Sequence, residues 1–185
     1  MIYLMRHGQD DESYIGGWSD VSLIQKGVHE VNLTGEWIKD NLNISSIQCS
    51  DVKRALETAN IISDILGLPY ELNNNLREQN KGDLNGVLRT NLSSSDLVYT
   101  SSKSVDMVYP NGESLRDLYN RMKMYLNQIM LMDDNTLLIT HRGVINMIYY
   151  ILYDKELDMN KKQFGVVTAS VHELDKDLKL IKKVR

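Results

Sequence analysis

Two stretches of the sequence, MIYLMRHG at residues 1–8 and TLLITHRG at residues 136–143, share one pattern. Each is a short apolar run that ends at a histidine, with a glycine directly after it or one residue later. Short apolar runs of this length are typical of buried strands. If the two strands are neighbours in a parallel sheet, His7 and His141 emerge close together at the carboxyl edge, where ligands of such sheets bind.

Strand-like and helix-like segments alternate along the rest of the chain. The predicted strands cover residues 2–5, 44–50, 136–140, 166–174 and 179–185. The predicted helices cover residues 25–41, 51–67, 113–132 and 144–152. Ser114 and Asp117 have the spacing of a capping box at the start of the third helix. This alternation predicts an α/β fold, a three-layer sandwich in which helices flank a mostly parallel central sheet.

The composition is that of a soluble globular protein, and a chain of 185 residues fits a single domain over 1–185. The net charge of −4 argues against nucleic acid and anionic membrane as partners. No apolar run is long enough to span a membrane, and the N-terminus does not read as a signal peptide, so the cytoplasm is the expected location. The serine-rich stretch 89–104 predicts a surface loop or a lid within a variable segment, 87–109.

Several cationic side chains stand where they can surround an anion. Arg6 precedes His7, and Arg54 lies in the first turn of a predicted helix, where free N–H groups also favour anions. Glu78 lies on a predicted loop that is followed by glycines. Phosphoryl transfer needs such cations, together with a nucleophile and a proton donor for the leaving oxygen. A neutral imidazole is suited to the nucleophilic role.

At this point the chain resembles the histidine phosphatase superfamily, in its phosphoglycerate mutase-like branch. The matching motifs occur in the family order: Arg6-His7-Gly8; Gly17-Trp18-x-Asp20 with Leu23 and Gly27; Ser50-x-x-x-Arg54-Ala55-x-x-Thr58-Ala59; Leu76-x-Glu78-x-x-x-Gly82 with Gly86; Pro110-x-Gly112-Glu113-Ser114; and Thr140-His141. The resemblance implies that His7 is a nucleophile phosphorylated on nitrogen. It implies that Arg6, Arg54 and His141 hold the phosphoryl group and that Glu78 acts as general acid and then base. It implies no metal and no cofactor.

The resemblance also predicts phosphate or substrate contacts at less certain positions. Gln9 is expected to meet the substrate, and Gly17 belongs to the family motif beside the phosphate. Ser13 stands where many members carry a phosphate-binding asparagine, and its hydroxyl can donate one hydrogen bond. Arg142 replaces a common glycine and is either a surface residue or a further cationic contact. Asp10 departs from the family pattern, and it is expected to point away from the phosphate because an acid there repels the substrate.

These features predict an enzyme of the histidine acid phosphatase type that hydrolyses a small phosphomonoester. The alternative is a cofactor-dependent mutase of the phosphoglycerate type. The segment 87–109 has only two basic residues, Arg89 and Lys103, and Gln79 stands where mutases have arginine, so hydrolysis is favoured. Two further hypotheses are an inactive phosphate-binding protein on the same fold and a zinc site formed by His7, His141 and Glu78. The sequence leaves the physiological substrate and the oligomeric state open, a homodimer included.

Overall fold

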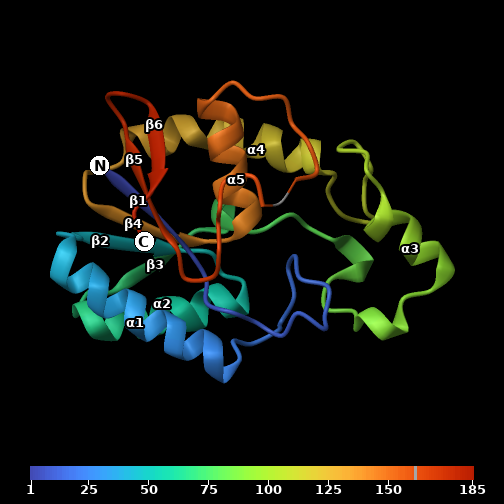
Figure 1. The fold of residues 1–185 in the computed structure, drawn as a ribbon, viewed down its shortest axis with the longest axis horizontal. Coiled ribbons are helices and arrows are strands. Elements are labelled where there is room, and N and C mark those ends of the chain that lie inside the picture. The colour runs from blue at the N-terminus through green and yellow to red at the C-terminus, as the bar shows by residue number, and fades with distance from the viewer. Residues whose placement is uncertain (161) are drawn as a thin grey trace.

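A computed structural model describes residues 1–160 and 162–185, and Figure 1 shows its fold. Over these residues one sheet of six strands has the order β3-β2-β4-β1-β5-β6. The strands are β1 (Ile2–Arg6), β2 (Ser46–Cys49), β3 (Tyr70–Leu72), β4 (Thr136–Thr140), β5 (Val171–Asp175) and β6 (Leu180–Lys183). The first four in the spatial order, β3 to β1, are mutually parallel, whereas β5 is antiparallel to β1 and β6 is antiparallel to β5. The predicted mostly parallel sheet is therefore confirmed.

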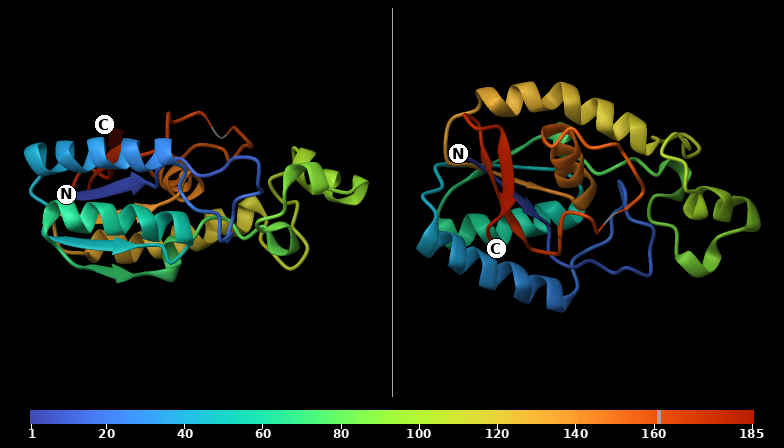
Figure 2. Two further views of the ribbon diagram at one scale, coloured as in Figure 1. Left: turned by 90° about the horizontal axis from the view of Figure 1, so that it is seen from below. Right: turned by 45° about the horizontal axis from the view of Figure 1, so that its top comes forward.

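Helices cover both faces of this sheet, which confirms the predicted α/β sandwich (Figures 1 and 2). The long helices are α1 (Gln25–Asn41), α2 (Lys53–Leu66), α4 (Leu115–Leu131) and α5 (Arg142–Leu152). Along β1, Ile2 and Leu4 pack into the apolar cluster that contains α4 and α5, while Tyr3 and Met5 pack into the cluster that contains α1 and α2. This alternation is what a strand with two buried faces requires, because successive side chains point to opposite sides.

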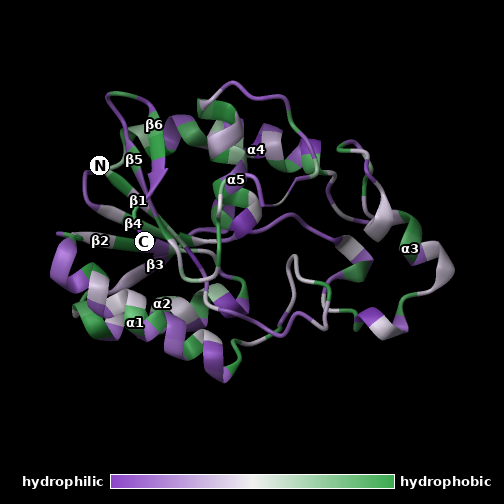
Figure 3. Ribbon diagram, in the orientation of Figure 1, coloured by the Kyte–Doolittle hydropathy of each residue, from purple (hydrophilic) through white to green (hydrophobic). Residues whose placement is uncertain are grey.

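Local sequence signals account for several helix ends. The Ser114 hydroxyl accepts a hydrogen bond from the Asp117 amide, and the Asp117 carboxylate accepts one from the Ser114 amide, so the predicted capping box is confirmed. Helix α2 ends at Gly67, which has a φ of 67° that glycine adopts without strain. Helix α5 is buried along most of its length, as its continuous apolar sequence predicts. Figure 3 shows the hydrophobic and hydrophilic stretches that alternate along α1, as expected of a helix with one face on the sheet.

The segment 87–109 is more ordered than the predicted loop. It contains a short 3-10 helix (Arg89–Asn91) and the helix α3 (Ser94–Ser101), which begins at a capping box of Ser93 and Asp96. Figures 1 and 2 show α3 on an arm that projects from the body of the molecule, beyond the carboxyl ends of the parallel strands. Serine and aspartate favour helix starts as much as loops, which explains why the composition alone did not predict a helix here.

Two further differences from the predicted elements have local causes. The three-residue strand β3 was not predicted, because it is a short edge strand with only one partly buried side chain. The last antiparallel pair was predicted correctly, but its first strand begins at Val171 and not at residue 166. The Ser170 amide instead donates to the Val167 carbonyl, and Ala169 has a φ of 54°, so this segment turns. Within the described residues, no helix combines the length and the apolar character that crossing a bilayer needs.

Candidate active site

The two histidines that follow β1 and β4 lie side by side, as predicted for neighbouring strands. The strands are parallel partners with Arg6 in register with Thr140, and the His7 amide donates to the Thr140 carbonyl at 2.9 Å. The centroids of the His7 and His141 rings are 5.1 Å apart. The sheet therefore brings residues separated by 134 positions into one site.

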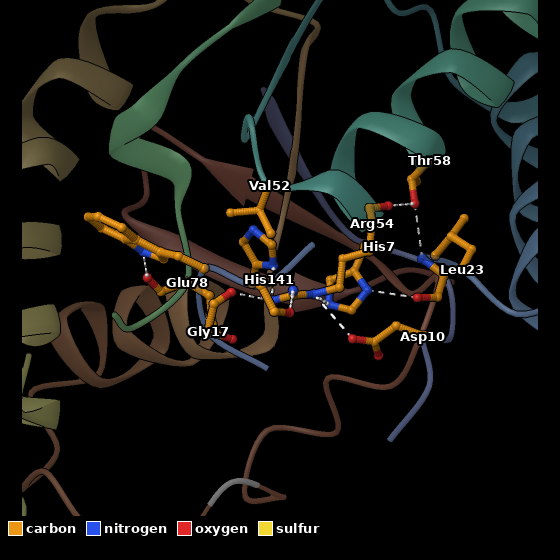
Figure 4. A network of polar contacts seen from close by, with 12 residues as sticks. His7, Asp10, Gly17, Leu23, Val52, Arg54, Thr58, Glu78 and His141 are labelled. Carbon is orange, nitrogen blue, oxygen red and sulfur yellow. Dashed lines mark hydrogen bonds and ion pairs between the residues drawn. The ribbon is translucent and has the colours of Figure 1, made fainter. Parts of the chain in front are cut away.

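Arg54 lies at the centre of this site and contacts both imidazoles (Figure 4). Its Nε donates to His7 Nε2 at 3.1 Å, and its Nη2 lies 3.1 Å from His141 Nδ1. The same guanidinium donates to the Gly17 carbonyl at 2.9 Å and to the Ser19 hydroxyl at 3.3 Å. Burial lowers the pKa of Arg54, but an arginine stays protonated at neutral pH. The site thus contains a rigid buried cation whose orientation is fixed by several partners.

His7 is held as a neutral imidazole with a defined tautomer. Its Nδ1 lies 2.7 Å from the Gly8 carbonyl, which can only accept, so Nδ1 carries the proton and Nε2 the lone pair. Burial, reinforced by the nearby charge of Arg54, lowers the pKa of His7 well below its ordinary value of 6.5. The Gly8 amide donates to Thr58 of α2, which fixes the turn after the strand. Nε2 is therefore unprotonated at neutral pH, and its lone pair accepts the hydrogen bond from Arg54 Nε.

His141 is predicted to hold the phosphoryl group, and that role stays a prediction. It is fully buried and stands behind Arg54, and it is not among the residues that line the cavity. Its Nε2 bonds the Ser50 hydroxyl at 2.8 Å, while its Nδ1 faces Arg54. In this arrangement His141 supports the guanidinium and does not itself face the space where a phosphate would bind.

Arg6 borders the same cavity from the end of β1. It is 8% exposed, and its Nη1 donates to the Val166 carbonyl at 3.2 Å, while its Nε is buried with no hydrogen-bond partner within the described residues. Burial, followed by the charge of Arg142, lowers the pKa of Arg6 to about 10, so it remains a cation at pH 7. A buried donor without a partner is costly, and an anionic ligand would satisfy it.

The segment after residue 165 is clamped by a buried chain of hydrogen bonds. Tyr149 bonds His172 Nδ1 at 2.8 Å, His172 Nε2 bonds the Ser170 hydroxyl at 2.9 Å, and that hydroxyl donates to the Val167 carbonyl at 2.7 Å. The Ser170 carbonyl in turn accepts from the Arg6 amide at 3.0 Å. His172 therefore links the buried core to the segment that contacts Arg6.

Glu78 lies on a loop, as predicted, and its carboxylate is held by two backbone amides. Oε1 accepts from Gln79 at 2.9 Å, and Oε2 accepts from Gly143 at 3.0 Å. Burial alone would raise the pKa of Glu78, but these two hydrogen bonds, with the charges of Arg54 and Lys81, lower it below its ordinary value. The carboxyl group is thus ionised at neutral pH.

Two residues that support Glu78 were not recognised in the sequence. A Cβ at Gly143 would lie 2.0 Å from Glu78 Oε1, so only glycine permits this approach. The sequence pattern that could have indicated this role is the glycine two residues after His141, which parallels Gly8 directly after His7. Arg121 of α4 donates through Nη2 to the carbonyls of Arg77, at 3.1 Å, and Glu78, at 3.3 Å. No sequence signal marks Arg121, because its partners belong to a distant loop.

These residues meet at a cavity of about 430 Å³. We use the name inner cradle for four lining residues, Arg6, His7, Arg54 and Glu78, together with His141, which contacts Arg54 but is not itself in the lining. We call the remaining lining residues from 12–15, 81–109 and 146–160 the outer wall, which includes Glu12, Tyr14, Arg89, Thr100, Tyr109, Asp158 and Asn160. The contribution from 158–160 was not anticipated in the sequence. The inner cradle contains the cations Arg6 and Arg54 and is buried except for the half-buried Glu78, whereas the outer wall is mixed in charge and largely more exposed.

The less certain sequence predictions have different outcomes. The expectation that Asp10 points away is wrong: its Oδ2 lies 3.4 Å from Arg54 Nε, and it lines the cavity (Figure 4). The Ser13 hydroxyl instead donates to Asp11 at 2.6 Å, outside the cavity lining, since the two residues form a local turn. Gln9 also lies outside the lining, whereas Gly17 and Arg142 are part of it.

The arrangement bears on the zinc hypothesis. Arg54 occupies His7 Nε2 and His141 Nδ1, which are the nitrogens that would have to bind a metal ion between the rings. A guanidinium in that position opposes a second cation. Among residues 1–160 and 162–185, no three His, Cys, Asp or Glu side chains are grouped as metal ligands. The donor set therefore does not fit a zinc ion.

Comparison with known proteins agrees with the geometry. Residues 2–182 match the sequence profile of the histidine phosphatase superfamily (branch 1), and the chain belongs to this family. It is 32% identical over 165 residues to a 2,3-bisphosphoglycerate-dependent phosphoglycerate mutase of Allorhizobium ampelinum, covering 82% of this chain and 78% of that protein. It is 33% identical over 158 residues to phosphoglycerate mutase-like protein 4 of Arabidopsis thaliana, covering 80% and 69% of the two chains.

Solved structures share the fold. A putative alpha-ribazole-5'-P phosphatase from Escherichia coli superposes with a TM-score of 0.82 at 19% identity, over 98% of this chain and 93% of the other. A mycobacterial glucosyl-3-phosphoglycerate phosphatase in complex with VO3 superposes with a TM-score of 0.77 at 22% identity, over 94% and 92% of the two chains. At these identities the similarity establishes the fold alone.

Proposed function

We propose that the protein hydrolyses a small phosphomonoester through a phosphohistidine formed on His7. The observation that carries this proposal is the state of His7: a neutral imidazole whose Nε2 lone pair faces the Arg54 guanidinium at the edge of a cationic cavity. An anion bound between Arg6 and Arg54 places its phosphorus near that lone pair. The family to which the chain belongs contains proteins named as phosphatases and as mutases, so the class of reaction is phosphoryl transfer.

In the first step His7 Nε2 attacks phosphorus and the ester oxygen leaves. Arg54 exchanges its contact with His7 for the phosphoryl oxygens, and the unpartnered Arg6 Nε supplies a further donor. These cations stabilise the charge that develops on the equatorial oxygens. Glu78 gives a proton to the leaving oxygen. It is ionised before substrate binds, and the dianionic substrate raises its proton affinity because two like charges in one pocket oppose ionisation of the second group, so Glu78 takes up a proton from solvent as substrate binds.

In the second step water attacks the phosphohistidine and free phosphate departs. Glu78 is then a carboxylate again and accepts the proton of the attacking water. It loses that proton to solvent when phosphate departs, which restores the ionised free enzyme. The amides of Gln79 and Gly143 hold the two carboxylate oxygens in place during this exchange. His141 acts through Arg54, because it contacts the guanidinium and not the cavity.

The outer wall supports hydrolysis over a mutase reaction. A mutase must exclude water from the phosphoenzyme while its bound intermediate reorients. The segment 87–109 supplies only Arg89, Thr100 and Tyr109 to the cavity, and α3 projects away from the sheet (Figures 1 and 2). Gln79, which stands in place of an arginine, is buried and donates to the Glu113 carbonyl at 3.0 Å. Water therefore has access to the phosphoryl group.

A phosphoglycerate mutase reaction is the second candidate. The observation in its favour is that the relatives with about 30% identity are named phosphoglycerate mutases. It would use the same inner cradle and differ only in the acceptor of the phosphoryl group. An inactive phosphate-binding protein is the third candidate.

The test compares release of inorganic phosphate from a panel of phosphomonoesters with conversion of 3-phosphoglycerate to 2-phosphoglycerate in the presence of 2,3-bisphosphoglycerate. We expect hydrolysis to exceed isomerisation for the same enzyme and to disappear in His7→Ala. Isomerisation faster than hydrolysis of every panel member would favour the mutase. Wild type that binds phosphate, with no turnover above His7→Ala in either assay, would favour the binding protein.

A further inference from the structure

Asp10 adds an acidic group to a cavity that is otherwise built to hold an anion. Its Oδ2 lies 3.4 Å from Arg54 Nε, the nitrogen that also donates to His7 Nε2. The Asp10 side chain is 14% exposed and that of Arg54 only 2%. The pair therefore meets at the inner end of the cavity, where exchange with water is limited (Figure 4).

The backbone around Asp10 fixes this position. Asp10 forms an isolated antiparallel bridge with Leu23, and the Gln9 carbonyl accepts from the Ile24 amide at 3.0 Å. The Leu23 amide donates to Glu57 of α2 at 2.7 Å, which ties the same strip to the helix that carries Arg54. These backbone contacts therefore fix the position of Asp10 at the site.

A phosphate bound for attack by His7 must share Arg54 with Asp10. Both are anions, and both approach the Nε edge of one guanidinium in a buried space, so their repulsion weakens binding. Asp10 could instead favour binding by keeping Arg54 charged and oriented. The contacts decide between these effects: Gly17, Ser19 and His141 already orient the guanidinium, and arginine is protonated at neutral pH without help.

We propose that Asp10 lowers the affinity of the site for inorganic phosphate and so promotes product release. The proposal rests on the proposed function, since phosphate is the product of that reaction. Asp10 acts in the free enzyme as the counter-ion of Arg54, and it returns to this role when phosphate leaves. The carboxylate thus limits how strongly a cationic cradle retains a dianion.

The test is the dissociation constant of inorganic phosphate at pH 7 and low salt, measured by isothermal titration calorimetry on the whole chain. Asp10→Asn keeps the shape of the side chain and removes its charge. We expect roughly tenfold tighter phosphate binding, a value reduced from the fully buried case because Asp10 is partly exposed. The phosphate inhibition constant in turnover should fall by the same factor.

Asp11→Asn is the matched control, because Asp11 is a neighbouring acid whose carboxylate bonds Ser13 outside the cavity. It makes the same change in net charge and should alter phosphate affinity by less than about twofold. Asp10→Ser serves as a second variant in case the asparagine perturbs folding. Unchanged or weaker phosphate binding in a folded Asp10 variant, or equal effects of Asp10→Asn and Asp11→Asn, would overturn the proposal. A wild type that binds no phosphate and hydrolyses no ester would contradict the proposed function itself.

Discussion

The inner cradle and the outer wall border one cavity but are built in different ways. The cradle residues follow β1 and β4, begin α2 or lie on a loop held by Arg121, and His141 and Arg54 are no more than 2% exposed. The outer wall comes largely from loops and from the projecting arm, and its Arg89 and Asp158 are exposed. The comparison teaches that the sheet fixes the reacting groups, whereas the loops supply the contacts that distinguish one ester from another.

The largest effect should follow loss of the central guanidinium. We expect Arg54→Met to lower kcat/KM for a small aryl phosphate by roughly 10³-fold, because it removes the donors that stabilise the transferring group. Arg54→Lys should recover little of this loss, since an ammonium lacks the planar fork that contacts His7, His141 and Gly17 together. Steady-state kinetics provide the measurement. Arg116→Met removes an exposed arginine paired with Asp106 and should change kcat/KM less than about twofold.

The next effect should depend on the leaving group. We expect Glu78→Gln to lower kcat/KM for alkyl phosphates by about 10²-fold, and much less for a nitrophenyl ester, whose leaving oxygen needs no proton. The measurement is the ratio of the two losses. Equal losses for both ester classes would show that Glu78 is not the proton donor.

A third prediction concerns stability and distinguishes the three buried histidines from the exposed His29. Burial lowers the pKa of His172 to about 4 from 6.5, so the unfolded chain binds a proton at pH 5 that the folded chain does not. This contribution to stability is present above pH 6.5 and is lost as the pH falls toward 4. We expect His172 alone to lower the free energy of unfolding by about 2 kcal/mol from pH 7 to pH 5. This is a change of roughly thirtyfold in the equilibrium constant of unfolding.

Urea denaturation at the two pH values provides this measurement. The pKa values of His7 and His141 are also lowered by burial, so they add to the loss in the same direction. His172→Asn should reduce the difference between pH 7 and pH 5, whereas His29→Asn, at an exposed position of α1, should leave it unchanged. If the difference in the free energy of unfolding between pH 7 and pH 5 stayed undiminished in His172→Asn, His172 would not be its source.

The smallest effects should come from the outer wall. We expect Arg89→Met and Asp158→Asn each to change KM by up to about tenfold. The two variants should act in opposite directions on any one ester, because the two side chains carry opposite charges at the same cavity. Both effects should reverse between esters whose alcohol part is anionic and esters whose alcohol part is cationic. The kcat for a small aryl phosphate should change little. If either variant lowered that kcat as far as Arg54→Met does, the division between cradle and wall would be wrong.

The same division explains what could be predicted from the sequence. Five of the six strands, the four long helices and the residues of the inner cradle follow from apolar periodicity, from histidines at strand ends and from the family motifs. Side-chain contacts between distant segments could not be predicted in this way. Examples are the support that Arg121 gives to a loop more than 40 positions away and the contact of His141 with Arg54. The prediction for Asp10 was wrong because it considered the repulsion of phosphate and not the attraction of Arg54.

The central claim is that His7 carries the phosphoryl group during turnover. The most direct test is to quench the enzyme in alkali within milliseconds of mixing with a phosphomonoester and to locate the phosphoryl group by mass spectrometry of its peptides. Our account predicts a phosphoryl group on His7 alone that survives alkali, is lost in acid and is absent from His7→Ala. Rapid turnover with no phosphoenzyme, or with the phosphoryl group on another residue, would contradict the account.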